Sequence, residues 1–271
     1  MSDVSNVAAS NKRLHGKVAI VTGGASGIGE STVHLFAENG AKVVIADIQD
    51  ELGRKISDKL GENVCYMHCD VSNEDDVIRL IDTAVSKYGH LDIMYNNAGI
   101  VDSPFANILH TNKSDLERVL GVNLVGSLLG AKHAARVMVP RRQGCILFTA
   151  SACASIAGVA SHPYTVSKYG IVGLTKNLAA ELGQYGIRVN CVSPTGMVSG
   201  SNFGVPAEVV EASSHATANL KGKILKVKDV AMAALYLASD EASYVSGLNL
   251  VVDGGYSVVN PTMMKAAGLI P

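Results

Sequence analysis

The chain has 271 residues, of which 48% are hydrophobic and 17% charged, and its formal net charge is −1. This size suits one large domain or two small ones, and the apolar content can supply a substantial core. The interspersed charges provide no basic surface for nucleic acid or an anionic membrane, so both partners are excluded and a small uncharged ligand is favoured.

Residues 1–14, MSDVSNVAASNKRL, are predicted to form a flexible N-terminal arm. They contain no apolar stretch typical of a signal peptide, and Asp3 with only two basic residues is atypical of an organelle transit peptide. Apolar runs further along, such as KVAIVT, are far shorter than the roughly 20 residues of a membrane-spanning helix. We therefore expect a cytoplasmic protein with no membrane segment.

Val- and Ile-rich runs alternate with longer amphipathic stretches along the rest of the chain. Strand-like runs occur at 17–22, 42–46, 64–69, 91–95, 144–149, 187–192 and 248–252. Because these strands are apolar throughout rather than alternating, helices should cover both faces of the sheet. The sequence predicts one α/β domain over 15–260, with a doubly wound, parallel, seven-stranded sheet, followed by a C-terminal tail at 261–271.

The stretch TGGASGIG, residues 22–29, follows the first predicted strand and opens the first predicted helix. Glycines here let the backbone turn tightly and approach a pyrophosphate, which then lies on the free N–H groups of the helix N-terminus. We predict that this loop binds a dinucleotide phosphate, through Gly23, Ser26, Gly27, Ile28 and Gly29.

Asp47 ends the second predicted strand. A carboxylate there accepts hydrogen bonds from ribose hydroxyls and repels the 2′-phosphate of NADP, although an ordinary helix N-cap is an alternative role. No Lys or Arg occurs at 24–26 or at Ile48. We therefore predict NAD rather than NADP, with Asp47 and Ile48 beside the adenosine.

Five cysteines are scattered along the chain without a C-x-x-C pair, which suits reduced thiols. Cys65, His68 and Cys69 are near enough in sequence to suggest a metal site. They lie on a predicted strand, however, where alternate side chains face opposite sides and cannot easily converge on one ion. We predict no metal.

A long helix is predicted at 113–139, ending before Pro140, and another at 163–184, with Pro163 in its first turn. The second helix places Tyr164 and Lys168 one turn apart on one face. Such a pair also occurs on many solvated helix faces, so its function depends on the other motifs.

Together these stretches resemble the short-chain dehydrogenase/reductase family, from about Leu14 to Tyr256. The family's motifs appear in order: TGGASGIG at 22–29, Asp70-Val71, NNAG at 96–99, Asn123, Ser151 and Tyr164-x-x-x-Lys168. The resemblance implies a single-domain Rossmann-type dehydrogenase. Its catalytic residues would be Asn123, Ser151, Tyr164 and Lys168.

Tyr164 would take the hydroxyl proton of an alcohol. A phenol with a pKa of about 10 is a weak base at neutral pH, so Lys168 and the positive nicotinamide ring are expected to lower that pKa. Ser151 would hydrogen-bond the substrate oxygen. In the family the lysine also contacts the nicotinamide ribose, and the asparagine, here Asn123, holds a water of a proton relay. Structural roles are expected for Ser155, Ser161 and Ser167.

The resemblance also assigns the remaining cofactor contacts. Asp70 and Val71 would contact the adenine, and the adenosine ribose would be lined by Asn97, Ala98 and Gly99. The nicotinamide loop, SPTGMVSG at 193–200, would contribute Pro194, Thr195, Gly196, Met197, Val198 and Ser199. Met197 and Ser199 depart from the family pattern of a branched aliphatic residue and a threonine, although serine keeps the hydroxyl.

A substrate lid is expected at about 196–222, with the stretch 101–109 on the opposite wall. The lid is rich in Val and has no Lys or Arg before Lys221, which favours a compact hydrophobic alcohol over an acidic or phosphorylated substrate. The closing pattern LNLVVDGGYSVVNP resembles the plant branch that includes secoisolariciresinol, xanthoxin and monoterpenol dehydrogenases. We predict oxidation of a terpenoid alcohol such as borneol to camphor, with a lignan diol or a xanthoxin-like or steroid alcohol as alternatives.

A non-catalytic NAD(H)-binding regulatory protein is the alternative of a different class. The complete set of four catalytic residues argues against it, because binding alone requires no base. Family members are commonly homotetramers assembled through the two long helices and the last strand. We therefore expect a homotetramer, with the apolar stretch TMMKAAGLIP either covering a pocket or forming a tail.

Overall fold

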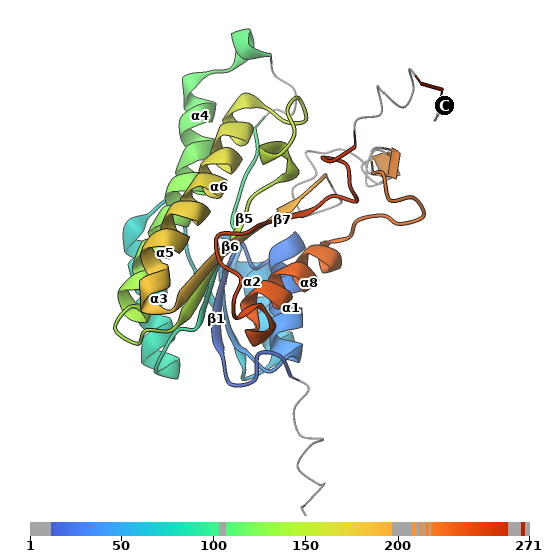
Figure 1. The fold of residues 1–271 in the computed structure, drawn as a ribbon. Coiled ribbons are helices and arrows are strands. Elements are labelled where there is room, and N and C mark those ends of the chain that lie inside the picture. The colour runs from blue at the N-terminus through green and yellow to red at the C-terminus, as the bar shows by residue number, and fades with distance from the viewer. Residues whose placement is uncertain are drawn as a thin grey trace, which may run out of the picture.

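Seven apolar runs form a parallel sheet in the computed structural model, which describes residues 12–102, 107–196, 208–209, 212, 215–216, 218–259 and 267–268. Within these residues the strand order is β3-β2-β1-β4-β5-β6-β7 (Figure 1). The strands are β1 Val18–Thr22, β2 Lys42–Asp47, β3 Val64–His68, β4 Ile93–Asn96, β5 Gly144–Thr149, β6 Ile187–Pro194 and β7 Asn249–Val252. The predicted parallel, seven-stranded α/β fold is confirmed.

The central strands are buried on both faces, which explains their continuous apolar character. All five residues of β1 are buried, and β1 pairs in parallel with β2 on one side and β4 on the other. The chain builds outward from β1 to β3 and then crosses to β4. Loops that leave β1 and β4 therefore diverge at the carboxyl ends of these strands, where open α/β sheets bind ligands.

Helices cover both faces of the sheet (Figure 1). One face carries α1 Gly27–Glu38, α2 Asp50–Leu60 and α8 Val227–Ala238; the other carries α3 Glu74–Tyr88, α4 Lys113–Leu120, α5 Ser127–Met138 and α6 His162–Leu182. Each face has its own apolar core: α1 and α8 pack together over one, and α3, α5 and α6 contribute to the other. Such two-sided coverage is what wholly apolar parallel strands require.

The predicted helix at 113–139 differs from the structure in its centre. Between α4 and α5 the residues Gly121–Gly126 form a π-helical segment, and α5 ends at Met138. A Cβ on Gly126 would lie 2.8 Å from Cγ2 of Val71, so the π-helical segment lies close to the segment that contains Val71. Periodicity cannot reveal a π-helical segment, because the apolar pattern continues through it.

The ends of the chain fall largely outside the described residues. Residues 1–11 of the predicted arm and most of the tail at 261–271 lie there, whereas Leu14 is fully buried and donates its N–H to Asn39. Over the described parts of the chain, no helix is long and apolar enough to cross a bilayer. All five cysteines are free thiols.

Candidate active site

The glycine loop joins β1 to α1 by a path that requires glycine. Gly23 and Gly27 have φ angles of 63° and 56°, in the left-handed region. A Cβ on Gly29 would lie 1.9 Å from the carbonyl oxygen of Gly23, and one on Gly23 would lie 2.8 Å from Cα of Ala98. The loop is therefore pressed against the NNAG segment, and side chains at these positions would separate the two.

The N-terminus of α1 has the geometry expected of a phosphate site. Ser26 is its N-cap in an extended conformation, and the Ser26 side chain makes no capping hydrogen bond. The first N–H groups of the helix are thus left without a side-chain acceptor, and their partial positive charge favours an anion. This arrangement fits the diphosphate of a dinucleotide cofactor.

Asp47 lies at the carboxyl end of β2, next to this loop. Its Oδ2 accepts a hydrogen bond of 2.9 Å from the N–H of Ala25, and its Oδ1 accepts one of 3.0 Å from the N–H of Gln49. The N-cap of α2 is Gln49, so the alternative role of Asp47 as that cap is not what the structure has. The buried carboxylate instead ties the glycine loop to the end of β2, and Ile48 beside it is exposed.

A polar cluster that sequence analysis missed supports the main chain of Asp47. The Tyr66 hydroxyl lies 2.7 Å from the Asp47 carbonyl oxygen and 2.5 Å from Oδ1 of Asp50. Nδ1 of His68 lies 2.7 Å from the same Asp50 oxygen. The hydrogen bond from Tyr66, followed by that from His68, lowers the pKa of Asp50. Within the described residues no three His, Cys, Asp or Glu side chains are placed to hold a metal ion.

The NNAG segment lies between the glycine loop and Lys168. The N–H of Asn97 donates to Oγ of Thr22 over 3.0 Å, while its side-chain oxygen lies 2.9 Å from Oγ of Thr149. A Cβ on Gly99 would lie 3.5 Å from Nζ of Lys168. The structure therefore brings the predicted cofactor contacts Asn97, Ala98 and Gly99 between the glycine loop and the lysine. Thr149 belongs to no motif that would have identified it, whereas Thr22 is the first residue of the TGGASGIG stretch.

The predicted adenine contacts lie where β3 leads into α3. Oδ1 of Asp70 accepts hydrogen bonds from the N–H and the hydroxyl of Ser72, over 2.9 and 2.7 Å. The N–H of Asp70 donates to Asp76. Val71 is buried against Gly126. This segment is therefore fixed by its own turn and by the π-helical segment.

Three of the four predicted catalytic residues come together at the carboxyl edge of the sheet. Ser151 follows β5, and Tyr164 and Lys168 lie in the first two turns of α6. The Ser151 hydroxyl acts on the phenol of Tyr164 and lowers its pKa. Nζ of Lys168 lies 5.4 Å from the centre of the Tyr164 ring and donates to the Thr149 carbonyl over 2.8 Å.

Burial dominates the protonation of this cluster. It lowers the pKa of Lys168 to about 8 and raises the pKa of Tyr164 above that of a free phenol, although the Ser151 hydroxyl opposes the latter shift. The expected lowering of the Tyr164 pKa by Lys168 is therefore not found in the protein alone. Removing the phenolate from water costs more free energy than the Ser151 hydroxyl contributes to its stability.

Asn123 lies in the π-helical segment and is 1% exposed. Its Oδ1 accepts from the N–H of Ile100, and its Nδ2 donates to the Ile100 carbonyl, each over 2.8 Å, and to Oγ of Ser167 over 3.1 Å. The side chain is thus fully engaged within the protein. The predicted water relay, which remains a prediction, would have to use the backbone carbonyl, which already accepts from Ser127.

The nicotinamide loop is only partly described. Pro194 ends β6, the N–H of Thr195 donates to the Val252 carbonyl over 3.2 Å, and Gly196 follows. Met197, Val198 and Ser199 lie outside the described residues, as do residues 103–106 of the predicted opposite wall and most of the predicted lid.

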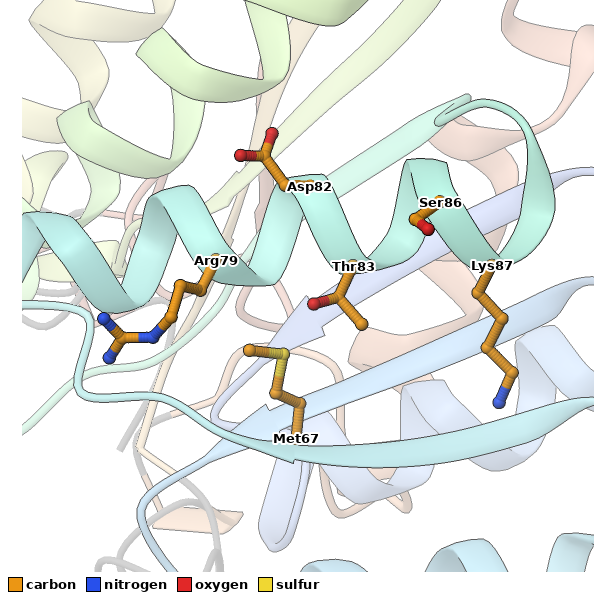
Figure 2. Close-up of a pocket in the computed structure, with 6 residues that line it drawn as sticks. All are labelled: Met67, Arg79, Asp82, Thr83, Ser86 and Lys87. Carbon is orange, nitrogen blue, oxygen red and sulfur yellow. The ribbon is translucent and has the colours of Figure 1, made fainter.

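A separate surface hollow lies between β3 and α3 (Figure 2). It is lined by Met67, Arg79, Asp82, Thr83, Ser86 and Lys87. It shares no residue with the glycine loop or with the cluster around Tyr164, and it is wide open to solvent. This hollow is therefore not part of the candidate active site.

Comparisons with known proteins extend over nearly the whole chain. A protein-family model described as enoyl-(acyl carrier protein) reductase matches residues 23–257. The chain is 67% identical over 264 residues to the (21S)-21-acetoxyl-apo-melianone synthase SDR of Melia azedarach, covering 97% of each protein. It is 60% identical over 260 residues to (+)-borneol dehydrogenase 1 of Salvia officinalis, covering 95% of this chain and 100% of that relative. The crystal structure of levodione reductase is similar with a TM-score of 0.85 at 28% identity, covering 92% of this chain and 100% of that one.

Proposed function

This chain belongs to the short-chain dehydrogenase/reductase family, and we propose that it is an NAD-dependent dehydrogenase of a hydrophobic secondary alcohol. That it is an oxidoreductase follows from its relatives. The observation that carries the finer proposal is the buried cluster of a phenol, a hydroxyl and an ammonium at the carboxyl edge of the sheet. A protein that only bound a dinucleotide would not need it.

The residues present fit a bound dinucleotide. The glycine loop and the uncapped N-terminus of α1 would hold its diphosphate, Asp47 the adenosine ribose, and Lys168 the nicotinamide ribose. When bound, NAD supplies a two-electron acceptor for the hydrogen on the alcohol carbon, together with a positively charged ring. The alcohol loses that hydrogen with its electron pair and its hydroxyl hydrogen as a proton.

Tyr164 receives the hydroxyl proton in this proposal. Its raised pKa means that the phenol is neutral in the protein alone, so the base forms only when further positive charge is nearby. Lys168, with a pKa of about 8, is mostly cationic at neutral pH and contributes part of that charge. The Ser151 hydroxyl donates to the substrate oxygen and stabilises it as the carbonyl forms.

A preference for NAD over NADP is supported by the fixed carboxylate of Asp47. Its two oxygens are oriented by the N–H groups of Ala25 and Gln49, so the negative charge cannot easily turn away from a ribose phosphate. Ile48, the next residue, supplies no compensating cation. Repulsion of the additional phosphate is therefore expected to disfavour NADP.

The substrate proposal depends on the names of the relatives. The Salvia officinalis protein is a dehydrogenase of borneol, which is an alcohol. The Melia azedarach protein is a synthase of (21S)-21-acetoxyl-apo-melianone, and the ending of that name denotes a ketone. We propose a terpenoid alcohol such as borneol, oxidised to camphor. The higher identity to the Melia azedarach protein favours, as a second candidate, the alcohol from which (21S)-21-acetoxyl-apo-melianone is formed.

The test is initial-rate NADH absorbance with purified wild type and Tyr164→Phe, supplied with NAD or NADP. The panel is borneol, other monoterpenols, secoisolariciresinol, a steroid alcohol and the alcohol precursor of the Melia azedarach compound. We expect turnover with NAD that falls at least about 10³-fold in Tyr164→Phe, whereas calorimetry shows NAD binding unchanged. NAD binding without turnover of any alcohol would instead favour the regulatory protein, and a preference for NADP would contradict the role of Asp47.

We further propose assembly as a homotetramer. Apolar side chains are 44–53% exposed on the outer faces of the two long helices, and β7 is an edge strand; the exposed residues are Val125, Leu128, Val166 and Tyr169. Light scattering would give four times the mass of the 28.2 kDa chain, and Leu128→Glu should reduce it. A monomeric wild type would contradict this proposal.

The free cysteines support a cytoplasmic location, which imaging of a fluorescent fusion would test.

A further inference from the structure

A buried carboxylate lies close to the start of the catalytic helix. Asp102, shortly after the NNAG segment, is 8% exposed, and its Oδ1 accepts a hydrogen bond from the hydroxyl of Ser161. A buried carboxylate is unfavourable unless it is hydrogen-bonded or lies near positive charge. The first turn of α6 contains no acidic residue of its own. Asp102 therefore supplies, from another segment, the negative charge that a helix N-terminus favours.

Ser161 links Asp102 to Tyr164 through hydrogen bonds of its hydroxyl group. It is the N-cap of α6, and its Oγ accepts a hydrogen bond of 3.3 Å from the N–H of Tyr164. A hydroxyl has a single proton, and here the proton is donated to Asp102. The lone pairs of the hydroxyl are thereby directed at the N–H of Tyr164, so Asp102 determines which way the cap points.

The other side of the Tyr164 backbone is held by the contacts of Asn123. The carbonyl of Tyr164 accepts from Oγ of Ser167 over 2.7 Å, and that Oγ accepts from Nδ2 of Asn123, which pairs with Ile100. Both backbone polar groups of Tyr164 are thus tied to the short segment 100–102. This segment continues directly from the predicted ribose contacts at 97–99.

We propose that Asp102 is a positioning residue, which acts through Ser161 to fix the first turn of α6 and so the Tyr164 hydroxyl relative to Ser151 and Lys168. The inference rests on the proposed function, because it assumes that Tyr164 is the base. Small displacements of a catalytic group lower the rate without a comparable loss of cofactor binding. The described hydrogen bond of Asp102 goes to Ser161 and not to the glycine loop, Asp47 or the ribose contacts at 97–99, so its loss should leave the adenosine contacts in place.

The first experiment needs neither substrate nor cofactor. Amide hydrogen exchange is followed by mass spectrometry in the full-length protein, for wild type, Asp102→Ala and Asp102→Asn. We expect exchange of the first-turn amides of α6 to accelerate about tenfold in Asp102→Ala, with strand peptides unchanged. Asp102→Asn keeps an oxygen that accepts the Ser161 proton and should remain within about threefold of wild type. Asn112→Ala, which removes the N-cap of α4, is the matched control and should leave α6 unchanged.

The second experiment is a double-mutant cycle with borneol and NAD. Asp102→Ala and Ser161→Ala should each lower kcat about tenfold with an unchanged dissociation constant for NAD, and the double variant should also lose about tenfold. Multiplied losses of about a hundredfold, an Asp102→Asn variant as slow as Asp102→Ala, or unchanged α6 exchange would each overturn the proposal. If wild type oxidises none of the alcohols, the proposed function fails, whereas the exchange experiment still decides whether Asp102 fixes the cap.

Discussion

The proposed adenosine side and the proposed catalytic side of this site differ in how far the protein compensates a buried charge. The Asp47 carboxylate is 6% exposed and accepts three hydrogen bonds, from Ala25 and from the main chain and side chain of Gln49. The Lys168 ammonium is 3% exposed, and within the described residues its one hydrogen bond goes to the Thr149 carbonyl. The first charge is compensated inside the protein. The second is left partly uncompensated, which destabilises the fold and keeps the ammonium available to a ligand.

The largest effect is expected for Lys168→Met, which removes the uncompensated charge. Burial lowers the pKa of Lys168 from 10.5 to about 8; the cation therefore costs on the order of 3 kcal/mol of stability. The lost bond to Thr149 offsets about 1 kcal/mol. At pH 7 the variant should be more stable by about 2 kcal/mol in urea unfolding, although alcohol oxidation is lost.

The pH dependence of the stability gained in Lys168→Met tests whether removal of the buried charge is its cause. Between pH 8 and 10.5 the unfolded wild type binds more protons than the folded one, so wild-type stability rises with pH. The advantage of Lys168→Met should be constant below pH 8 and shrink above it. Lys176→Met, on the same helix, is the control and should show no such trend. A gain that did not change with pH would mean that better packing, rather than charge removal, explains it.

Asp47→Ala tests the compensated side. Loss of a charged acceptor should weaken NAD binding about 10- to 100-fold and reduce the preference for NAD over NADP, as measured by calorimetry with both cofactors. Asp58→Ala removes an exposed carboxylate from α2 and should leave both affinities unchanged. Equal losses of NAD and NADP affinity in Asp47→Ala would show that the residue supports the glycine loop without discriminating between them.

The smallest effect is expected for Tyr66→Phe, which removes a hydroxyl from the cluster that supports Asp47. The Asp47 carbonyl also accepts from the N–H of Cys69, so only about 1 kcal/mol of stability and less than fivefold of NAD affinity should be lost. The pKa of Asp50 should rise toward its ordinary value, which NMR titration would show. Tyr88→Phe, which removes a hydroxyl that contacts Cys65, should not affect Asp50. An unchanged Asp50 would contradict the role of the Tyr66 bond.

Local sequence patterns predicted the elements better than the contacts between them. The apolar runs located all seven strands, and Pro163 marks the start of α6. Neither pattern indicates that Gly121–Gly126 is π-helical or that Gly126 lies against Val71, because both are properties of the folded chain. Asp102 follows the NNAG segment without a motif of its own, and only folding brings it to Ser161.

The sequence by itself determined the parallel sheet and the glycine loop, because these depend on residue type, spacing and order along the chain. Its resemblance to the short-chain dehydrogenase/reductase family supplied the candidates Asn123, Ser151, Tyr164 and Lys168. Tertiary structure decided the protonation of Tyr164 and Lys168 and the hydrogen bonds that hold the site residues in place. Burial, a property of the packed molecule, raises the pKa of Tyr164 and lowers that of Lys168. The hydrogen bonds that hold Asp47 and Tyr164 join segments that are distant in sequence, so they exist only once the sheet has brought the carboxyl ends of its strands together.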